Sequence, residues 1–297
     1  MLQPDLNDII KYFRSILSKN ISTAALSWLD KNIESIHASE NDKSLFTGFS
    51  IAPRHVGKSK LTFSEEDLQQ ARNLHPGFNP ANFSADQATR VVLLLCSYKN
   101  DSASFINKIE KILGTADIQE QVAIYSSLPL LPYAEKMSAR AADGLRTNIT
   151  AIFEAIALEN PYPSEHLSEA AWNQMVVKAI FTNRPLYKIY GFDDRRNAAL
   201  ADMLSDFAHE RWAAGRTVTP ELWRATTPFL LTGVLWDDID KILKSDNPLE
   251  VEAGCLACSE STLEDAKLRL AKYPSIKSQI ESKQLSWNIL GKKVEGN

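Results

Sequence analysis

Apolar residues recur at helical spacing in one segment after another of this 297-residue chain. They return every three or four positions, which places them on one face of a helix. Ser84 and Gln87 form a capping box that leads into residues 88–98, which are apolar almost all round and predict a central helix. The other helices predicted from this spacing cover residues 5–17, 23–36, 102–113, 117–128, 133–158, 165–181, 197–214, 219–231, 236–244, 248–259 and 262–271.

No strand pattern alternates with these helices, and the chain contains neither a G-x-G-x-x-G motif nor a P-loop. An α/β enzyme fold is therefore not supported. Residues 45–63 are the one stretch with an extended pattern, and we predict that they run over the surface as a long connection. The spacing as a whole predicts an all-α fold.

Two segments of the chain, residues 109–127 and 239–257, align without gaps. Each has a helix that ends in Ile-Leu, a short turn and a second helix. Stacked helix pairs of this kind build α-solenoids. We therefore predict an irregular HEAT-like helical-repeat array over residues 64–297, preceded by N-terminal helices and the extended connection in residues 1–63, with both parts in one continuous structural domain.

Charge and hydropathy limit which kinds of partner the protein can bind and where in the cell we expect it. The net charge of −4 and the pI near 5.8 argue against nucleic-acid binding, which needs a basic face. The longest apolar run, residues 91–96, is far short of the roughly 20 residues that span a bilayer, so no transmembrane segment is predicted. The N-terminus lacks the pattern of a signal peptide, which predicts a cytoplasmic protein. Disorder is expected only in residues 291–297.

The three cysteines argue against a disulfide framework because their number is odd. Cys255 and Cys258 form a C-x-x-C motif without a second pair or a nearby histidine, so no metal site is predicted. Their surroundings are rich in small residues, which favours close helix packing over redox or metal chemistry. No cofactor is predicted.

The segment 208–224 crowds charged and aromatic residues into one joint between helices. Gly215, Thr219, Pro220 and Glu221 fit a C′ glycine, an N-cap, a first-turn proline and a first-turn acid. Capping does not explain Arg211, which projects within about 20° of the centre of the apolar stripe.

Arg211 is either an anion-binding arginine or, as we prefer, a structural one. A structural arginine would pair with a carboxylate such as Asp143 or Glu154, or extend its stem past the helix end. His209 falls nearly opposite the stripe. We prefer a solvated residue near Asp206 for it over a general base, because a catalytic histidine needs a pocket.

Four other polar residues lie close to apolar stripes. Arg146 flanks the stripe of its helix, and Asn173 borders that of the next one. Gln174 and Lys178 sit one turn apart on the other face, where they could contact a ligand or serve only solubility.

The run 148–224 resembles the EboA family, and its most specific pieces are "FEAIALENPYP", "AAWNQMVVKAIF" and "AHERWAAGR". "SIAPRHVGKSKL" (50–61) is similar to the extended connection of that family. The resemblance implies the first-gene product of a bacterial secondary-metabolite cluster that handles a precursor between cytoplasm and periplasm. Its partners in the cluster resemble a prenyltransferase, a metal-dependent hydrolase and a sugar-phosphate cyclase. The resemblance transfers no catalytic residue, and its motifs map onto Arg146, Asn148, Glu154, Asn160, Trp172, Asn173, Gln174, Lys178, His209, Arg211, Trp212 and Arg216.

Two functions are open at this point. The first is a non-enzymatic helical-repeat accessory protein that binds a partner protein or an anionic metabolite precursor, since no nucleophile–base–orienter signature is present. The alternative is an enzyme or carrier for a phosphorylated or prenylated intermediate, with Glu154 or His209 as acid–base. The candidate binding residues are Arg146, Glu154, Asn173, Gln174, Lys178, His209, Arg211, Trp212 and Arg216.

Overall fold

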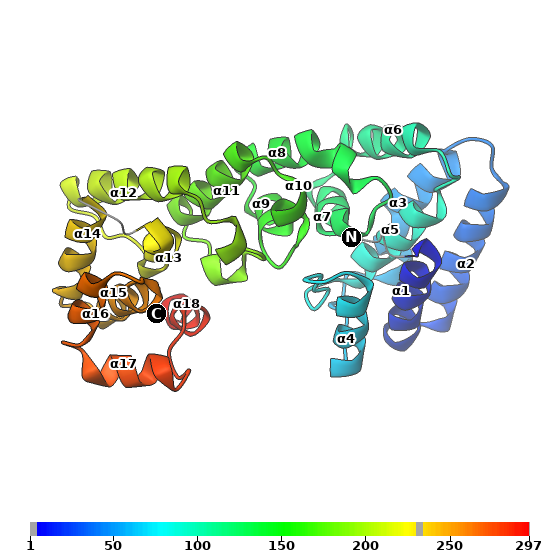
Figure 1. Ribbon diagram of the computed structural model, residues 1–297. Helices are drawn as coiled ribbons and strands as arrows, with labels where there is room; N and C mark the ends of the chain where they lie inside the picture. The colour runs from blue at the N-terminus through cyan, green and yellow to red at the C-terminus, as the bar shows by residue number, and fades with distance from the viewer. Residues whose placement is uncertain (1–4, 230–233, 297) are drawn as a thin grey trace. The chain divides into compact units, whose positions relative to one another are not determined.

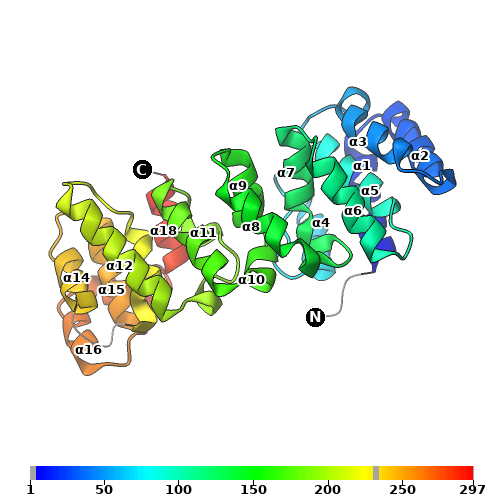
Figure 2. The same cartoon turned by 90° about the horizontal axis from the view of Figure 1, so that it is seen from above.

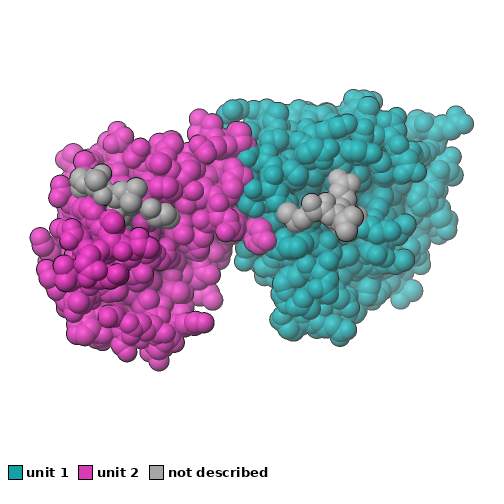
Figure 3. Space-filling model, viewed as in Figure 1, with its two compact units in different colours: residues 1–167 teal, residues 168–297 magenta. Residues whose placement is uncertain are grey.

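The computed structural model describes residues 5–229 and 234–296. In these residues it contains α-helices and short 3-10 turns, and its β-structure is limited to an isolated bridge between Lys60 and Ser84. The predicted all-α fold is thus confirmed, while the HEAT-like arrangement and the domain division at residue 63 stay predictions. The chain forms two compact units, residues 1–167 and 168–297 (Figure 3). None of the described helices is both long and apolar enough to cross a membrane.

Unit 1 is built around α5 (Ala85–Cys96), which is buried along its whole length. The Ser84 capping box starts this helix, and its apolar surface contacts α1, α2, α3 and α7 (Figure 1). The helices of unit 1 besides α5 are α1 (Leu6–Asn20), α2 (Thr23–Ala38), α3 (Lys43–Val56), α4 (Glu65–Leu74), α6 (Ser102–Leu113), α7 (Ile118–Ser126), α8 (Ser138–Arg146), α9 (Thr150–Ala157) and α10 (Tyr162–His166).

The prediction that residues 45–63 are extended is wrong for most of that range, because residues 45–56 belong to α3. This helix contains Pro53, which lies in its last turn. Leu45, Phe49 and Ala52 are buried at helical spacing and hold α3 on the core. Within the range 45–63, only residues 57–63 lack helical structure.

The single helix predicted over residues 133–158 is also wrong. The structure has a 3-10 turn η2 (Ala134–Met137), then α8, and then α9. The break falls at Thr147–Ile149, where the Thr147 hydroxyl accepts from the backbone N–H of Ile149 at 3.2 Å. This local side-chain bond offers the backbone an alternative to the helix.

Unit 2 is built around α15 (Pro248–Glu260), which contacts α13, α14, α16, α17 and α18. The predicted close packing of its small residues is confirmed: a Cβ at Gly254 would lie 2.8 Å from Cδ2 of Leu243. Figure 2 shows α14, α15 and α16 grouped in the orange part of the chain. The other helices of unit 2 are α11 (Glu169–Phe181), α12 (Ala198–Ala213), α13 (Trp223–Thr226), α14 (Val234–Leu243), α16 (Glu264–Leu270), α17 (Pro274–Glu281) and α18 (Trp287–Glu295).

The two aligned segments each fold as a helix, a short turn and a second helix. Residues 109–127 hold the end of α6 and all of α7, and residues 239–257 hold the end of α14 and most of α15. Asp117 and Asn247 cap the second helix of the pair in each case. The two aligned segments thus share a local helix–turn–helix structure, and the repeat array itself stays a prediction.

The expected disorder of residues 291–297 is wrong for the described part of that tail. Helix α18 continues to Glu295, and Lys293 bonds Glu252 of α15 at 2.7 Å. Gly291 is buried, and its missing side chain lets α18 approach Glu221 and Tyr187 closely. Packing against α15 orders a segment whose charged sequence suggested a free end.

Candidate functional site

The C-terminal end of α12 is the joint that the sequence predicted. Gly215 has a left-handed φ of +67°, and the backbone N–H of Arg216 donates to the carbonyl oxygen of Arg211 at 2.8 Å. The Arg211 side chain passes the helix end, and its Nε and Nη2 both donate to the carbonyl oxygen of Thr217 at 3.2 Å. Arg211 is therefore partnered by a backbone carbonyl, in the extended-stem form that we considered, rather than by a carboxylate.

His209 has a specific partner on α14. Its Nε2 lies 2.6 Å from Oδ1 of Asp238, whose side chain is 4% exposed, while the His209 side chain is 43% exposed. The Ser205 hydroxyl donates to the second oxygen of the same carboxylate at 2.8 Å. His209 is thus exposed to solvent, as we preferred, but its acidic partner is Asp238 and not Asp206.

Trp212 connects the same helix to α13 and α14. Its indole stacks on that of Trp223, with 5.6 Å between the ring centroids and 21° between the planes. Nζ of Lys241 lies 3.6 Å from the centroid of the Trp212 ring, a cation–π contact, and the His209 ring is 5.7 Å away. We call His209, Trp212, Trp223, Asp238 and Lys241 the α12–α14 cluster.

The α12–α14 cluster contains both buried and exposed side chains. Trp223 is fully buried, and its Nε1 has no hydrogen-bond partner among the described residues. Trp212 is half-buried, whereas Lys241 and His209 are exposed. The exposed Lys241 ammonium group lies over the half-buried Trp212 ring, an arrangement that suits a molecule with an anionic group and an apolar body.

The second half of the joint follows the prediction in part. Thr219 stands at the N-cap position of the 3-10 turn η5 (Pro220–Leu222), but its side chain makes no capping hydrogen bond; Pro220 is the first residue of the turn. Glu221 is more than a first-turn acid: it is 2% exposed and accepts from the backbone N–H groups of Leu186 and Tyr187. Burial raises the pKa of Glu221, although these two hydrogen bonds and the charge of Arg224 oppose the shift.

The predicted residues on α11 have separate environments. Asn173 is buried and exchanges two amide hydrogen bonds with Asn197, the N-cap of α12, at 3.0 and 2.8 Å. Gln174 is exposed. Lys178 is half-buried, and burial lowers the pKa of its ammonium group.

The remaining predicted residues are Arg146, Glu154 and Arg216, and none of them is a member of the α12–α14 cluster. Arg146 is exposed on α8 and forms an ion pair with Asp143 one turn earlier. Glu154 is half-buried on α9. Both belong to unit 1, whereas the α12–α14 cluster belongs to unit 2. Arg216 is exposed in the loop that follows Gly215.

Asp238 and Lys241 were missed by the sequence reasoning, although both stand in the acidic run "WDDIDK". Their spacing of three residues on α14 places them on neighbouring positions of one face, which was the available signal. Arg224 was also missed: it bonds both oxygens of Asp193 at 2.8 and 2.7 Å and Asn288 at 3.0 Å. This second network links α13 to α18 through the buried Arg224, while Asp193 and Asn288 are exposed.

No three histidine, cysteine or acidic side chains converge to hold a metal ion in the part of the chain that the structure describes. The profile of one protein family, described as metabolite traffic protein EboA, matches residues 9–227. The chain belongs to the EboA family. No curated protein and no solved structure matches it.

The EboA match covers one part of the α12–α14 cluster and not the other. His209, Trp212 and Trp223 lie inside the matched residues, whereas Asp238 and Lys241 follow its end at residue 227. The aromatic part of the cluster thus belongs to the family region, and α14 supplies the carboxylate and the ammonium group that complete it. Membership in this family supports a metabolite-related role for the chain.

Proposed function

We propose that this EboA protein is a non-enzymatic accessory protein of metabolite traffic, which binds an anionic metabolite precursor or a partner protein through the α12–α14 cluster. The observation that carries the proposal is the half-buried indole of Trp212, with Nζ of Lys241 3.6 Å from its centroid. Trp223 stacks on this indole and fixes its orientation. A rigid aromatic ring beside a cation is the type of anchor that dominates binding energy at recognition sites.

Binding is favoured over catalysis because Ser205 and His209 each contact Asp238 and do not form a serine–histidine–aspartate chain. In a hydrolase triad the histidine stands between the nucleophile and the carboxylate. Here the Ser205 hydroxyl donates directly to Asp238, and it is buried. Its proton is engaged by the carboxylate, so Ser205 is not a nucleophile held by His209.

Further charged residues extend the proposed surface. Arg211 uses two of its donor atoms on Thr217 and keeps others for an anion, and Arg216 is exposed five residues later. Gln174 and Lys178 on α11 are secondary candidates in the same unit. We place this role in the cytoplasm of a bacterium, in the secondary-metabolite cluster that the family resemblance implies.

Calorimetric titration with geranyl diphosphate and with inorganic diphosphate tests the metabolite branch. The apolar chain of the first probe should contact the half-buried Trp212 side chain, so it should bind more tightly than the second. Lys241→Gln and Trp212→Leu should each weaken binding of geranyl diphosphate about tenfold or more, by loss of the charge or of the aromatic face.

Two variants, one on α14 and one directly after it, serve as matched controls. Lys244→Gln removes an exposed lysine one turn after Lys241. Trp236→Leu removes a tryptophan that has its own cation–π partner, Arg269, at 4.6 Å. Both should bind as the wild type does, and equal losses in all four variants would rule out the cluster as the site.

The partner branch is tested by native mass spectrometry of the protein purified gently from its own bacterium. A co-purifying protein that is absent from the Trp212→Leu preparation and present in the Trp236→Leu preparation would support it. If both variants retain the same partner, the cluster is not the docking site.

A second candidate function is an enzyme or carrier that acts on a phosphorylated or prenylated intermediate. It is favoured by one contact: Asp238 holds Nε2 of His209 at 2.6 Å, which leaves Nδ1 of a partly exposed imidazole available as a base. Release of diphosphate from geranyl diphosphate measures this activity. His209→Gln should abolish the release while the probe still binds, and absence of release by the wild type would dismiss the enzyme form of this candidate.

A further inference from the structure

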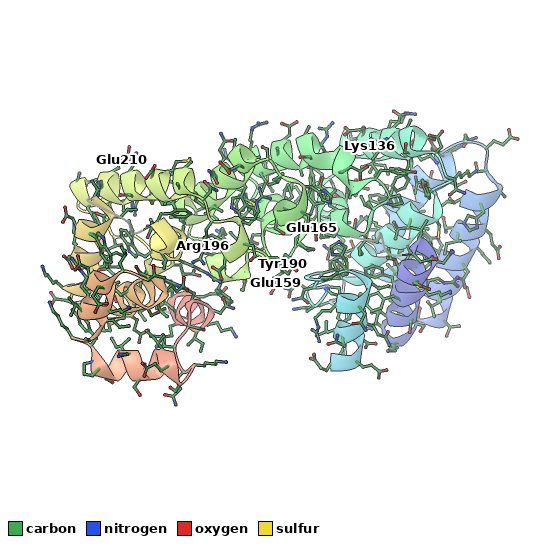
Figure 4. The ribbon with its side chains drawn as sticks, viewed as in Figure 1. Lys136, Glu159, Glu165, Tyr190, Arg196 and Glu210 are labelled. Atoms are coloured by element: carbon green, nitrogen blue, oxygen red, sulfur yellow. The ribbon has the colours of Figure 1, made fainter. Side chains whose placement is uncertain are left out.

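Three ionisable side chains of unit 1 meet at α10, independently of the α12–α14 cluster. Nε2 of His75 and Nε2 of His166 lie 3.4 and 3.9 Å from the same carboxylate oxygen, Oε2 of Glu165. The side chains of His75 and Glu165 are only 11% and 13% exposed. Figure 4 labels Glu165 where α10 lies. His75 directly follows α4, so this contact joins two helices that are 90 residues apart in the chain.

Both ring nitrogens of His75 face hydrogen-bond acceptors. Nδ1 lies 3.0 Å from the carbonyl oxygen of Pro76, and Nε2 faces the carboxylate of Glu165. A neutral imidazole carries one N–H and can satisfy one of these oxygens, whereas the imidazolium satisfies both. The geometry therefore fits the protonated form of His75. After loss of the proton, one ring nitrogen carries no hydrogen and faces an oxygen acceptor without a hydrogen bond.

We propose that His75 and Glu165 form a pH-operated latch, which holds the start of the α4–α5 loop on α10 when His75 is protonated and releases it when His75 loses its proton. The largely buried Glu165 carboxylate makes the contact strongly dependent on charge, since an ion in a poorly solvated site needs a counter-ion.

The α10 side of the latch is fixed. The Tyr162 hydroxyl donates to the carbonyl oxygen of Ala134 at 2.7 Å, and the Ser138 hydroxyl donates to the carbonyl oxygen of His166 at 2.9 Å. These bonds involve no group that titrates near neutral pH. Release therefore moves the loop and leaves α10 in place.

Only the first part of the loop is free to move. Phe83 stacks on Phe13 with 5.8 Å between ring centroids, and Phe78 meets Phe83 edge-on at 5.8 Å. Gly77, between His75 and these rings, has a φ of +82° and is the natural hinge. The N–H of Phe78 donates to the carbonyl oxygen of His75 at 3.1 Å, so this amide reports on the latch.

The two histidines respond to pH with opposite signs. Burial opposes the charge on His75, but the hydrogen bond and charge of Glu165 and the Pro76 carbonyl raise its pKa above the ordinary 6.5. Its contribution to stability is thus complete below pH 6.5 and is lost as the pH rises through the raised value. Burial lowers the pKa of His166; the charge of His75 lowers it further, whereas the charges of Glu165 and Glu135 oppose the shift. The contribution of His166 to stability is therefore lost as the pH falls and this histidine is protonated.

Amide hydrogen exchange of the full chain, corrected for intrinsic rates, tests the latch at about pH 5.5 and about pH 8.5. The protection of the Phe78 amide should fall about tenfold at the higher pH, as expected for loss of a hydrogen bond to a charged group. The Phe83 amide, which donates to the Pro80 carbonyl at 2.8 Å, is the internal control and should keep its protection.

Two variants separate the latch from general loosening. Glu165→Gln removes the counter-ion with little change in size and should abolish the pH step at Phe78, and His75→Gln should do the same. Asn82→Ala removes another link of this loop to the α9–α10 segment, a bond of 3.0 Å to Glu159, and should leave the step intact. Equal protection of Phe78 at both pH values in the wild type, or a step that survives in Glu165→Gln and His75→Gln, would overturn the proposal.

Discussion

The guanidinium of Arg90 donates through Nε to the carbonyl oxygen of Phe49, 3.0 Å away. Pro53 stands four residues after Phe49 in α3 and has no N–H, so the usual helical donor for this oxygen is missing. Arg90, on α5 and 1% exposed, replaces it. The same side chain pairs with Asp86 at 2.5 Å one turn earlier on its own helix. A charged group at the centre of unit 1 thus compensates for a proline in a neighbouring helix.

Arg90→Met should lower the free energy of unfolding of unit 1 by about 3–5 kcal/mol, because it leaves the buried Asp86 without a counter-ion and the Phe49 oxygen without a donor. Denaturant titration followed by far-UV circular dichroism measures the loss. Arg72→Met, which breaks an exposed ion pair with Glu65, is the control and should have little effect. If the two variants unfold alike, the Arg90 contacts do not stabilise α3.

Gly291→Ala should loosen α18. A Cβ at this position would lie 2.5 Å from Oε1 of Glu221 and 2.6 Å from Cδ1 of Tyr187. Overpacking of this kind costs about 1–3 kcal/mol and should speed tryptic cleavage after Lys293. Gly296→Ala, whose Cβ would meet only ordinary contacts at 3.5 Å or more, should be cleaved like the wild type. Equal cleavage of both variants would contradict the close approach of α18.

The cysteines should be unreactive in the folded chain. Burial raises the pKa of Cys96 to about 11, of Cys255 to about 12 and of Cys258 to about 11, so almost none of these thiols is ionised at neutral pH. Iodoacetamide at about pH 7.5 should label none of them in native protein and all three in denaturant, as counted by intact mass. Rapid native labelling of Cys255 or Cys258 would instead point to a reactive C-x-x-C motif.

Local patterns predicted those features whose causes lie within one helix. Residues 102–113 were expected as a helix and form α6, and the capping residues Gly215 and Thr219 stand where the sequence placed them. Arg211 was recognised as out of place on an apolar stripe. Its partner, the Thr217 carbonyl oxygen, depends on where the chain turns after the helix, which helical periodicity does not specify.

Features that depend on distant residues were not predictable in the same way. His209 was correctly placed opposite the apolar stripe, but its partner Asp238 is 29 residues later on another helix. Helix α3 was mistaken for an extended connection because Pro53 weakens its local signal and Arg90, which compensates, belongs to α5. The binding roles assigned to the candidate residues stay predictions, because burial and bonding describe their surroundings and not their ligands.

Asn173 and Gln174 are neighbours on α11 that separate structural from surface roles. Asn173→Ala removes both amide bonds to Asn197, which keeps its bonds to Arg195 and Leu200, and the loss of two hydrogen bonds should cost about 1–3 kcal/mol. Gln174→Ala changes an exposed side chain and should stay within about 0.5 kcal/mol of the wild type.

Tryptophan fluorescence during denaturant titration is a suitable probe of this pair, since Trp28 is the single tryptophan outside unit 2. Titration of both variants with geranyl diphosphate then tells the two roles apart. Normal affinity in folded Asn173→Ala would make Asn173 a packing residue that only positions α12. Weakened affinity in Gln174→Ala, at unchanged stability, would instead extend the binding surface from the α12–α14 cluster onto α11.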